Sequence, residues 1–387
     1  MRSSFGWSTD FNRKMVSEAF WSNEIESELR EQKIVYGFSG RKINCAAVKQ
    51  HIETVRTSKL YDHNCSMEST SGCQFLDMMD GLWKFGHKHC AMPVKKIVDI
   101  RHINLPQVCE NQPTKNSKFC LPHHGPLKNL EQAMSKEEFK SYLAQKEAAV
   151  RVVSDNLFQD EMEENAGNAL TSELNCNNKN VVAPWCRKRS GRKTKESWSR
   201  GIFVYVAACG TILSYSPIYK SESLSQVLVL TLEFLYKRMQ LLANHLWSKY
   251  FLCYDNMCNL CRLKALKEPL NHVLPEGYDN MFNIINKIVD GLHMSNHRRE
   301  DCHVLYNPNK FSDVHPEVSR NTMAAEQTFS WLGRYRKQVN SMNKTNQHLF
   351  LHRVIIRRNW YITQCMQNGQ TPVVCSLRSR EERFGFT

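Results

Sequence analysis

The segment that most constrains the fold of this chain is Gly201–Leu213, GIFVYVAACGTIL, in which apolar residues follow one another almost without interruption. It is shorter than the ~20 residues needed to span a bilayer, so it predicts buried strands and no membrane span. TILSYSPIY continues it as a second strand, and a helix is expected to begin near Ser223. YFLCYDNMCNL then predicts a further strand, apolar up to Asp255. Strands followed by helices predict an α/β core with a helical C-terminal end.

The chain outside this segment varies in charge and apolar content, without any repeat of 20 to 50 residues. FLDMMDGLWKFGHKHC predicts a strand that ends in a tight turn at Asp80-Gly81. The acidic stretch EQAMSKEEFKSYLAQKEAAVRVV predicts a helical insertion between two core strands. Near the end, Leu332, Tyr335, Val339 and Met342 predict one amphipathic helix, and a second follows it.

We expect two units, an N-terminal accessory region over residues 1–72 and a larger folded domain over residues 73–387. A chain of 387 residues is long enough for this, at roughly one domain per ~150 residues. The second unit is expected to hold, in order, the first core strand (73–100), a zinc-type insert (101–125), an acidic helical insert (126–185), the remaining core strands (186–262), a His/Cys insert (263–320) and the C-terminal basic helices, which include Glu326 (321–387).

The excess of basic residues predicts a polyanionic partner. With 52 Lys and Arg against 38 Asp and Glu, the formal net charge is +14, and nucleic acid is favoured over a membrane surface. The run RKRSGRKTK is a candidate phosphate contact or nuclear-import signal, or a solvated loop. The predicted DNA-binding residues are Arg187, Lys188, Arg189, Arg192, Lys193 and Lys195 in this run and Arg353, Arg357 and Arg358 in the last helix.

Three acidic residues follow or lie within apolar elements: Asp80, Asp255 and Glu326. Converging carboxylates suit Mg²⁺ or Mn²⁺, and three can hold a pair of ions that clamps the attacking and leaving oxygens of a phosphoryl transfer. Each acid also has an ordinary structural explanation, because Asp before Gly is common in turns and Glu is favoured at helix starts. The trio is therefore a candidate metal site.

Cysteine and histidine form candidate zinc sites. The 15 Cys are expected to be reduced, because the chain opens without an apolar stretch of signal-peptide length. Cys109, Cys120 and His124 supply three ligands of a structural Zn²⁺ site, and the fourth is His102, Cys90 or a more distant residue. The alternative is a set of reduced thiols and surface histidines; the neighbouring His123 belongs to the same cluster.

A second cluster is His293, His297 and Cys302, in which the two histidines are expected one helical turn apart on the same face. This favours a zinc-stabilised or hydrogen-bonded insert over a catalytic zinc. Cys258 and Cys261 have the spacing of half a zinc ribbon, but beside a buried strand they are more often plain core residues.

The segments around the three acids resemble a known family. DGLWK, CYDNMCNL and NTMAAEQTFSWLGRYRKQVNSM are similar to the Kyakuja-Dileera-Zisupton (KDZ) transposases of eukaryotes, with RSGRKTKESWSRGIFVYVAACGTILSYSPIYKSESLSQV and DGLHMSNHRREDCHVLYNP in that family's order. The resemblance covers residues 75–366. It implies a ribonuclease H-like mixed sheet core with cysteine/histidine-rich and helical insertions. It also implies a DDE-type site formed by Asp80, or its neighbour Asp77, with Asp255 and Glu326.

The resemblance implies metal-dependent DNA cleavage and strand transfer in the nucleus, with transposon ends and target DNA as partners and a homo-oligomeric assembly. Catalytic Mg²⁺ or Mn²⁺ and structural Zn²⁺ are the expected cofactors. Two alternatives remain. One is a domesticated or decayed transposase that binds DNA or chromatin without cutting. The other is a zinc-dependent DNA or chromatin adaptor in which the acids are incidental.

Overall fold

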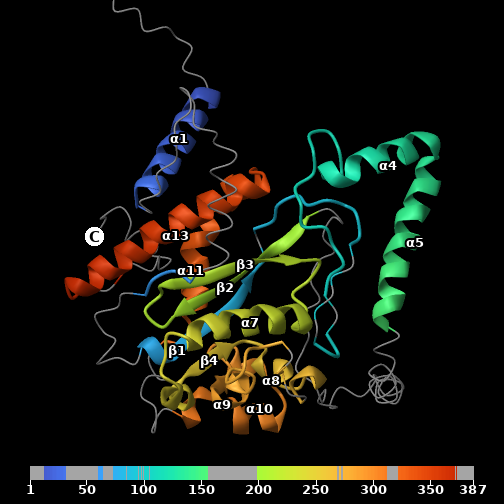
Figure 1. The fold of residues 1–387 in the computed structure, drawn as a ribbon. Coiled ribbons are helices and arrows are strands. Elements are labelled where there is room, and N and C mark those ends of the chain that lie inside the picture. Colours follow the sequence, from blue (N-terminus) through green and yellow to red (C-terminus); the bar gives the residue numbers. More distant parts are fainter. Residues whose placement is uncertain are drawn as a thin grey trace, which may run out of the picture.

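The computed structural model describes residues 13–31, 60–63, 73–155, 198–311, 321–370 and 372, except for single positions 84, 95, 97, 99, 104, 268, 269 and 272. These residues form a mixed α/β fold around one five-stranded sheet (Figure 1). The strands lie in the order β3-β2-β1-β4-β5. β2 is antiparallel to β1 and β3, whereas β4 is parallel to β1 and β5. Their bounds are β1 Leu76–Leu82, β2 Ser199–Ala207, β3 Ile212–Tyr219, β4 Phe251–Tyr254 and β5 Asn286–Ile288.

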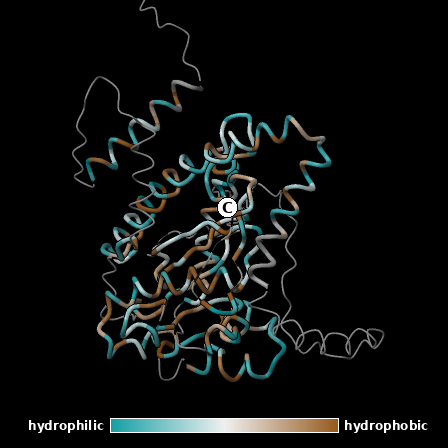
Figure 2. The backbone as a smooth tube through the Cα atoms, turned by 45° about the vertical axis from the view of Figure 1, so that its right-hand side comes forward, coloured by the Kyte–Doolittle hydropathy of each residue, from teal (hydrophilic) through white to brown (hydrophobic). Residues whose placement is uncertain are grey.

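Helices cover both faces of the sheet (Figure 1). Helices α7 to α10 lie on one face, and α11 and α13 lie on the other. Figure 2 shows many of the hydrophobic residues in the central part of the molecule. The two hydrophobic cores lie between the sheet and these helices. The bounds are α1 Arg13–Glu31, α4 Leu121–Ala133, α5 Lys136–Asp155, α7 Leu224–Met239, α8 Met257–Leu260, α9 Met281–Ile284, α10 Glu300–Leu305, α11 Ala324–Leu332, α12 Arg336–Asn340 and α13 Lys344–Gln367. Among the described helices, none has the length and apolar content to cross a bilayer.

The α/β fold class predicted from the sequence is confirmed, and the apolar segment that led to it forms most of β2, the turn that follows, and the start of β3. Because side chains alternate along a strand, β2 supplies both cores. Phe203 and Tyr205 pack under α7, while Ile202 and Val204 pack under α11 and α13. A segment buried on both faces has no room for polar positions, which explains its near-continuous apolar sequence.

Helix α7 begins where the sequence places it. Ser223 is its N-cap, and the Ser223 side chain accepts a hydrogen bond from the Gln226 amide. The single amphipathic helix predicted through Leu332 and Met342 is wrong, because the chain instead forms α11, a 3₁₀ turn over Gly333–Tyr335, and α12. The C-cap of α11 is Gly333, a poor helix former that favours the break.

The turn predicted at Asp80-Gly81 is also wrong, since β1 continues through both residues to Leu82. Alternation along β1 separates the two aspartates that the sequence left as alternatives. Asp80 shares its face with Leu76 and Met78 beneath α11, whereas Asp77 faces α7. Asp77 is fully buried and pairs with Arg238 of α7, at 2.9 Å between Oδ2 and Nε. Asp77 therefore has a structural partner, and Asp80 is left for the site.

Helix α1 lies against α13 through ion pairs. Arg353 is buried and bonds to three glutamates of α1, with Glu24 at 3.0 Å, Glu28 at 2.7 Å and Glu31 at 2.5 Å. The DNA contact predicted for Arg353 is wrong in this arrangement, because its guanidinium is enclosed and neutralised. Arg357 also pairs with Glu24, at 2.7 Å, but stays exposed. Arg358 stacks over Trp331 and Tyr361, with its guanidinium carbon 5.1 and 5.0 Å from the ring centroids.

A buried histidine between the sheet and α13 gives a pH prediction. The ring N–H of His87 donates to Gln347 Oε1 at 2.8 Å, and burial, aided by the charge of Lys344, lowers the pKa of His87 to about 4. The His87 imidazole becomes protonated below about pH 6.5 in the unfolded chain, whereas in the folded chain it stays neutral down to about pH 4. Stability should therefore fall as the pH drops through this window, by up to about 3 kcal/mol.

Urea unfolding at a series of pH values measures this slope, with His87→Gln as the comparison, because the variant lacks the titrating ring. Nuclear magnetic resonance follows the imidazole directly. A His87 ring that titrates in the folded protein near pH 6.5 would contradict the expectation.

Candidate functional site

Two predicted acids lie side by side near the carboxyl ends of neighbouring parallel strands. Met79 of β1 pairs with Tyr254, the last residue of β4, so the residues that follow them, Asp80 and Asp255, are also neighbours. Both strands run in the same direction, which brings these carboxylates to the same edge of the sheet. Asp80 is buried and Asp255 is half-buried.

A third carboxylate, which the sequence did not indicate, completes the group. One oxygen each of Asp80, Asp255 and Glu222 lie within 4.8 Å of one another, close enough to share a metal ion. Glu222 stands directly before the N-cap of α7. Its two oxygens accept hydrogen bonds from the Trp83 indole and, at 2.7 Å, from the Tyr254 hydroxyl. These bonds fix the carboxylate toward the other two.

Gly81 is required by this arrangement and not by a turn. A Cβ at position 81 would lie 2.1 Å from Glu222 Oε2, which is too close for two non-bonded atoms. Glycine therefore admits the Glu222 carboxylate beside β1. The Gly81 amide also donates to Asp80 Oδ1 at 2.7 Å, which orients the neighbouring acid.

The electrostatics of the cluster favour a cation. Burial, followed by the charges of Asp255 and Glu222, raises the pKa of Asp80 well above its ordinary value. Three carboxylates this close repel one another when ionised, and a divalent cation removes that cost while taking hard oxygen ligands. The donor set therefore fits Mg²⁺ or Mn²⁺.

Glu326 stands beside this group on the first turn of α11. It lines the same small cavity as Asp80, Asp255 and Asp290, and its charge contributes to the raised Asp80 pKa. The Glu326 side chain is 40% exposed, and its Oε1 lies 3.8 Å from His293 Nε2. The structure thus brings Asp80 and Asp255 together and places Glu326 at the rim of their cavity.

His293 belongs to the carboxylate site and not to the predicted zinc cluster. Its Nδ1 bonds to Asp290 Oδ2 at 2.7 Å while its Nε2 points to Glu326. The expected helical spacing of His293 and His297 is wrong, because a 3₁₀ turn over Met294–Asn296 separates them and His297 is extended. The partners of His297 are Cys302 and Cys258, whose ligand atoms lie within 4.8 Å of one another.

This second cluster touches the carboxylate site through one hydrogen bond. His297 Nε2 lies 2.9 Å from the backbone oxygen of Asp255, which can only accept, so the proton sits on Nε2. His297 Nδ1 then presents its lone pair to Cys258 Sγ at 3.4 Å. Burial lowers the pKa of His297, which keeps the ring in the neutral form that binds metals.

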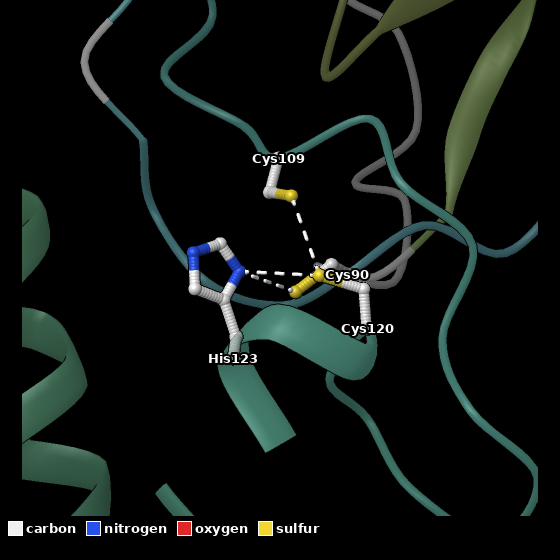
Figure 3. A group of neighbouring side chains, drawn as sticks. All are labelled: Cys90, Cys109, Cys120 and His123. Carbon is white, nitrogen blue, oxygen red and sulfur yellow. Dashed lines mark hydrogen bonds between the residues drawn. The ribbon is translucent and has the colours of Figure 1, made fainter. Parts of the chain in front are cut away.

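The first predicted zinc cluster is present with different members. Figure 3 shows Cys90, Cys109, Cys120 and His123 pointing toward one another. The His123 Nδ1 atom lies 3.4 Å from Cys90 Sγ and 3.3 Å from Cys120 Sγ, and the Cys109 and Cys120 sulfurs are 3.8 Å apart. Tetrahedral zinc with ordinary bond lengths requires about 3.5 Å between nitrogen and sulfur and about 3.8 Å between sulfurs.

Two predicted ligands of that cluster lie outside it. His124 Nδ1 bonds to Ser117 Oγ at 3.0 Å, and His102 is likewise not among the grouped ligands. The reason lies at the start of α4, where Cys120 is the N-cap and the first turn aims His123, but not His124, at the thiols. The four grouped residues can hold a metal ion such as zinc.

The other predicted DNA-binding residues lie in the run Arg187–Lys195, outside the residues that the structure describes. Of the residues that the sequence missed, Glu222 had only its place before a predicted helix as a signal, and Cys258 was interpreted as a core residue.

Comparison of the chain with protein-family models, curated proteins and solved structures finds no match. The function is therefore inferred from the side chains and their placement.

Proposed function

We propose that this protein is a DDE-type DNA transposase with a ribonuclease H-like fold, as its resemblance to the KDZ family implies. The observation that carries the proposal is the meeting of Asp80 and Asp255 near the carboxyl ends of β1 and β4, with Glu326 lining the same cavity from α11. The first strand, the fourth strand and a later helix are the elements from which the resemblance derives the three acids.

The sheet supports the proposal independently of the acids. The order β3-β2-β1-β4-β5, with β2 antiparallel and β4 and β5 parallel to β1, fits a ribonuclease H-like core. The cysteine- and histidine-containing insertions also lie between core elements, as the resemblance to the KDZ family implies. The chain between β1 and β2 includes the Cys90 group with α4 and α5, and the chain between β5 and α11 includes His297 and Cys302.

Divalent ions bound here would activate the attacking oxygen and stabilise the leaving oxygen of a phosphodiester. Asp80 and Asp255 would hold them from the rigid sheet, and Glu326 would complete the site from the more exposed helix. Glu222 sits within ligand distance as a further carboxylate. His293 orients Glu326 from one side and is itself fixed by Asp290.

The wider proposal follows the same interpretation. A net charge of +14 favours DNA, and Arg357 and Arg358 remain candidate phosphate contacts on α13. Nuclear localisation and homo-oligomeric assembly belong to the proposal, as does zinc in the Cys90 and Cys258 groups.

Cleavage of supercoiled plasmid with Mg²⁺ or Mn²⁺ tests the proposal. Asp255→Asn and Glu326→Gln keep the size and hydrogen bonding of each side chain but remove its charge, so each should lower the cleavage rate by about 10²-fold or more. Glu233→Gln is the matched control, because Glu233 is an exposed acid on α7 that pairs with Lys237 and lies outside the site.

The alternative is a binder that retains the fold without cutting. Cleavage that needs the metal and is lost in both site variants, but not in the control, supports the transposase. If the unmodified protein and all variants bind DNA with equal affinity and none cuts it, the catalytic proposal fails and the binder takes its place.

A further inference from the structure

A third cysteine and histidine group lies away from both clusters described above, at the opposite end of β1 from the carboxylates. His63 comes from the chain that precedes β1, Cys73 opens the 3₁₀ turn Cys73–Phe75 directly before β1, and Cys209 lies in the turn between β2 and β3. One ligand atom of each lies within 4.8 Å of the other two. His63 and Cys73, which are 10 residues apart, thus converge with Cys209, which lies 146 residues after His63.

The distances match metal ligation. His63 Nε2 lies 3.3 Å from Cys209 Sγ and 3.5 Å from Cys73 Sγ. A tetrahedral zinc ion requires about 3.5 Å between an imidazole nitrogen and a thiolate sulfur. The Cys90 group has the same nitrogen–sulfur distances, 3.3 and 3.4 Å.

Hydrogen bonding accounts for this arrangement less well. Each ring nitrogen of a neutral imidazole carries either one hydrogen or one lone pair, so a hydrogen bond at His63 Nε2 would have to be shared between the two sulfurs and weakened. Here both sulfurs approach the same nitrogen at nearly equal distance. A single cation bound by all three atoms satisfies both contacts together, and two thiolates with one imidazole are soft ligands that suit Zn²⁺.

We propose that His63, Cys73 and Cys209 bind a structural zinc ion that joins the start of β1 to the turn between β2 and β3. The three side chains supply three of the four positions of tetrahedral zinc. This inference stands apart from the proposed function, because it needs neither the carboxylates nor DNA.

Hydrogen bonds near the proposed site indicate which segments the zinc ion would hold together. The Ala208 amide donates to the Leu76 carbonyl at 3.1 Å, and the Asn321 side chain donates to the Ala208 carbonyl at 3.0 Å. Asn321 stands just before α11, the helix of Glu326. A metal at Cys209 would therefore fix the turn on which β1 and the entry to α11 both rest.

Metal analysis of the full chain, purified under reducing conditions, tests the proposal. Cys209→Ser should lower the zinc content by one ion per chain relative to the unmodified protein. Cys365→Ser is the control, since Cys365 lies on α13 outside the groups of possible ligands, and the zinc content of this variant should stay unchanged.

A second measurement on the unmodified protein keeps the proposal falsifiable if Cys209→Ser does not fold. Alkylation of Cys209, followed by mass spectrometry, should be slow with zinc bound. It should speed up at a chelator concentration that leaves the circular dichroism unchanged, while alkylation of Cys365 is unaffected. Equal zinc in Cys209→Ser, chelator-independent alkylation, or a Cys73–Cys209 disulfide in place of bound metal would each overturn the proposal.

Discussion

Replacing Asp77 by asparagine is expected to lower the free energy of unfolding by about 3–5 kcal/mol, the usual cost of breaking a buried ion pair. Asp77 is fully buried, and Arg238, to which it bonds at 2.9 Å, is 5% exposed. The Tyr250 hydroxyl donates to the same carboxylate oxygen. Asparagine keeps the shape but leaves the Arg238 charge buried without a counter-charge. Urea unfolding followed by circular dichroism measures the loss.

Asp80→Asn is the matched control, the same substitution three residues along the same strand. Asp80 is also buried, but its neighbours are the carboxylates of Asp255 and Glu222, and burial with their charges raises its pKa. Removing its charge relieves repulsion, so in metal-free buffer the variant should be as stable as the unmodified protein or more stable. Equal destabilisation by both substitutions would contradict the assignment of Asp77 to structure and Asp80 to the site.

Asp77 and Asp80 also show how much of the structure can be predicted from the sequence. Periodicity located the strands, because a strand buried on both faces must be apolar throughout, as Gly201–Leu213 is. It also placed Asp255 correctly, since an acid that directly follows an apolar strand lies at the edge of a sheet. It did not resolve Asp77 from Asp80. The distinction depends on which face of β1 meets α7, and that is a tertiary property.

The residues that the sequence missed share one physical cause. Glu222 and Cys258 join their groups through contacts between segments far apart in the chain, and local spacing carries no information on such contacts. Gly81 is a further residue whose role cannot be predicted from its sequence neighbours. Asp-Gly is a turn signal, but here glycine is needed because the Glu222 carboxylate occupies the space of a side chain.

Arg353 illustrates the limit for charge. A basic helix face in a cationic protein predicts a phosphate contact, yet three glutamates of α1 enclose this arginine. Those acids stand more than 300 residues earlier in the chain. Net charge indicates the kind of partner, whereas the fold decides which charges remain free to meet it.

Removing the metal from the Cys90 group should unfold the region around α4 and α5 while leaving the central sheet intact. That region has a small core of its own, in which Phe119 and Phe139 pack edge to face with Leu127 beside them. So few apolar residues rarely hold a fold without a staple, and zinc bound by three thiolates and an imidazole contributes on the order of 10 kcal/mol at neutral pH. Burial raises the pKa of the metal-free Cys90 thiol to about 12, so without a cation this thiol keeps its proton and its attraction to the metal is lost.

Cys120→Ser is therefore expected to raise amide hydrogen exchange over residues 90–143 by more than about 10³-fold, the loss of several kcal/mol of local stability. Exchange in β2 and β3 should not change. Cys365→Ser, at a buried cysteine of α13 outside the grouped ligands, is the control and should leave both regions protected. Unchanged exchange over residues 90–143 in Cys120→Ser would mean that the small core holds without a metal. In that case the four side chains form only a hydrogen-bonded cluster, because a staple that carries the local stability cannot be removed without effect.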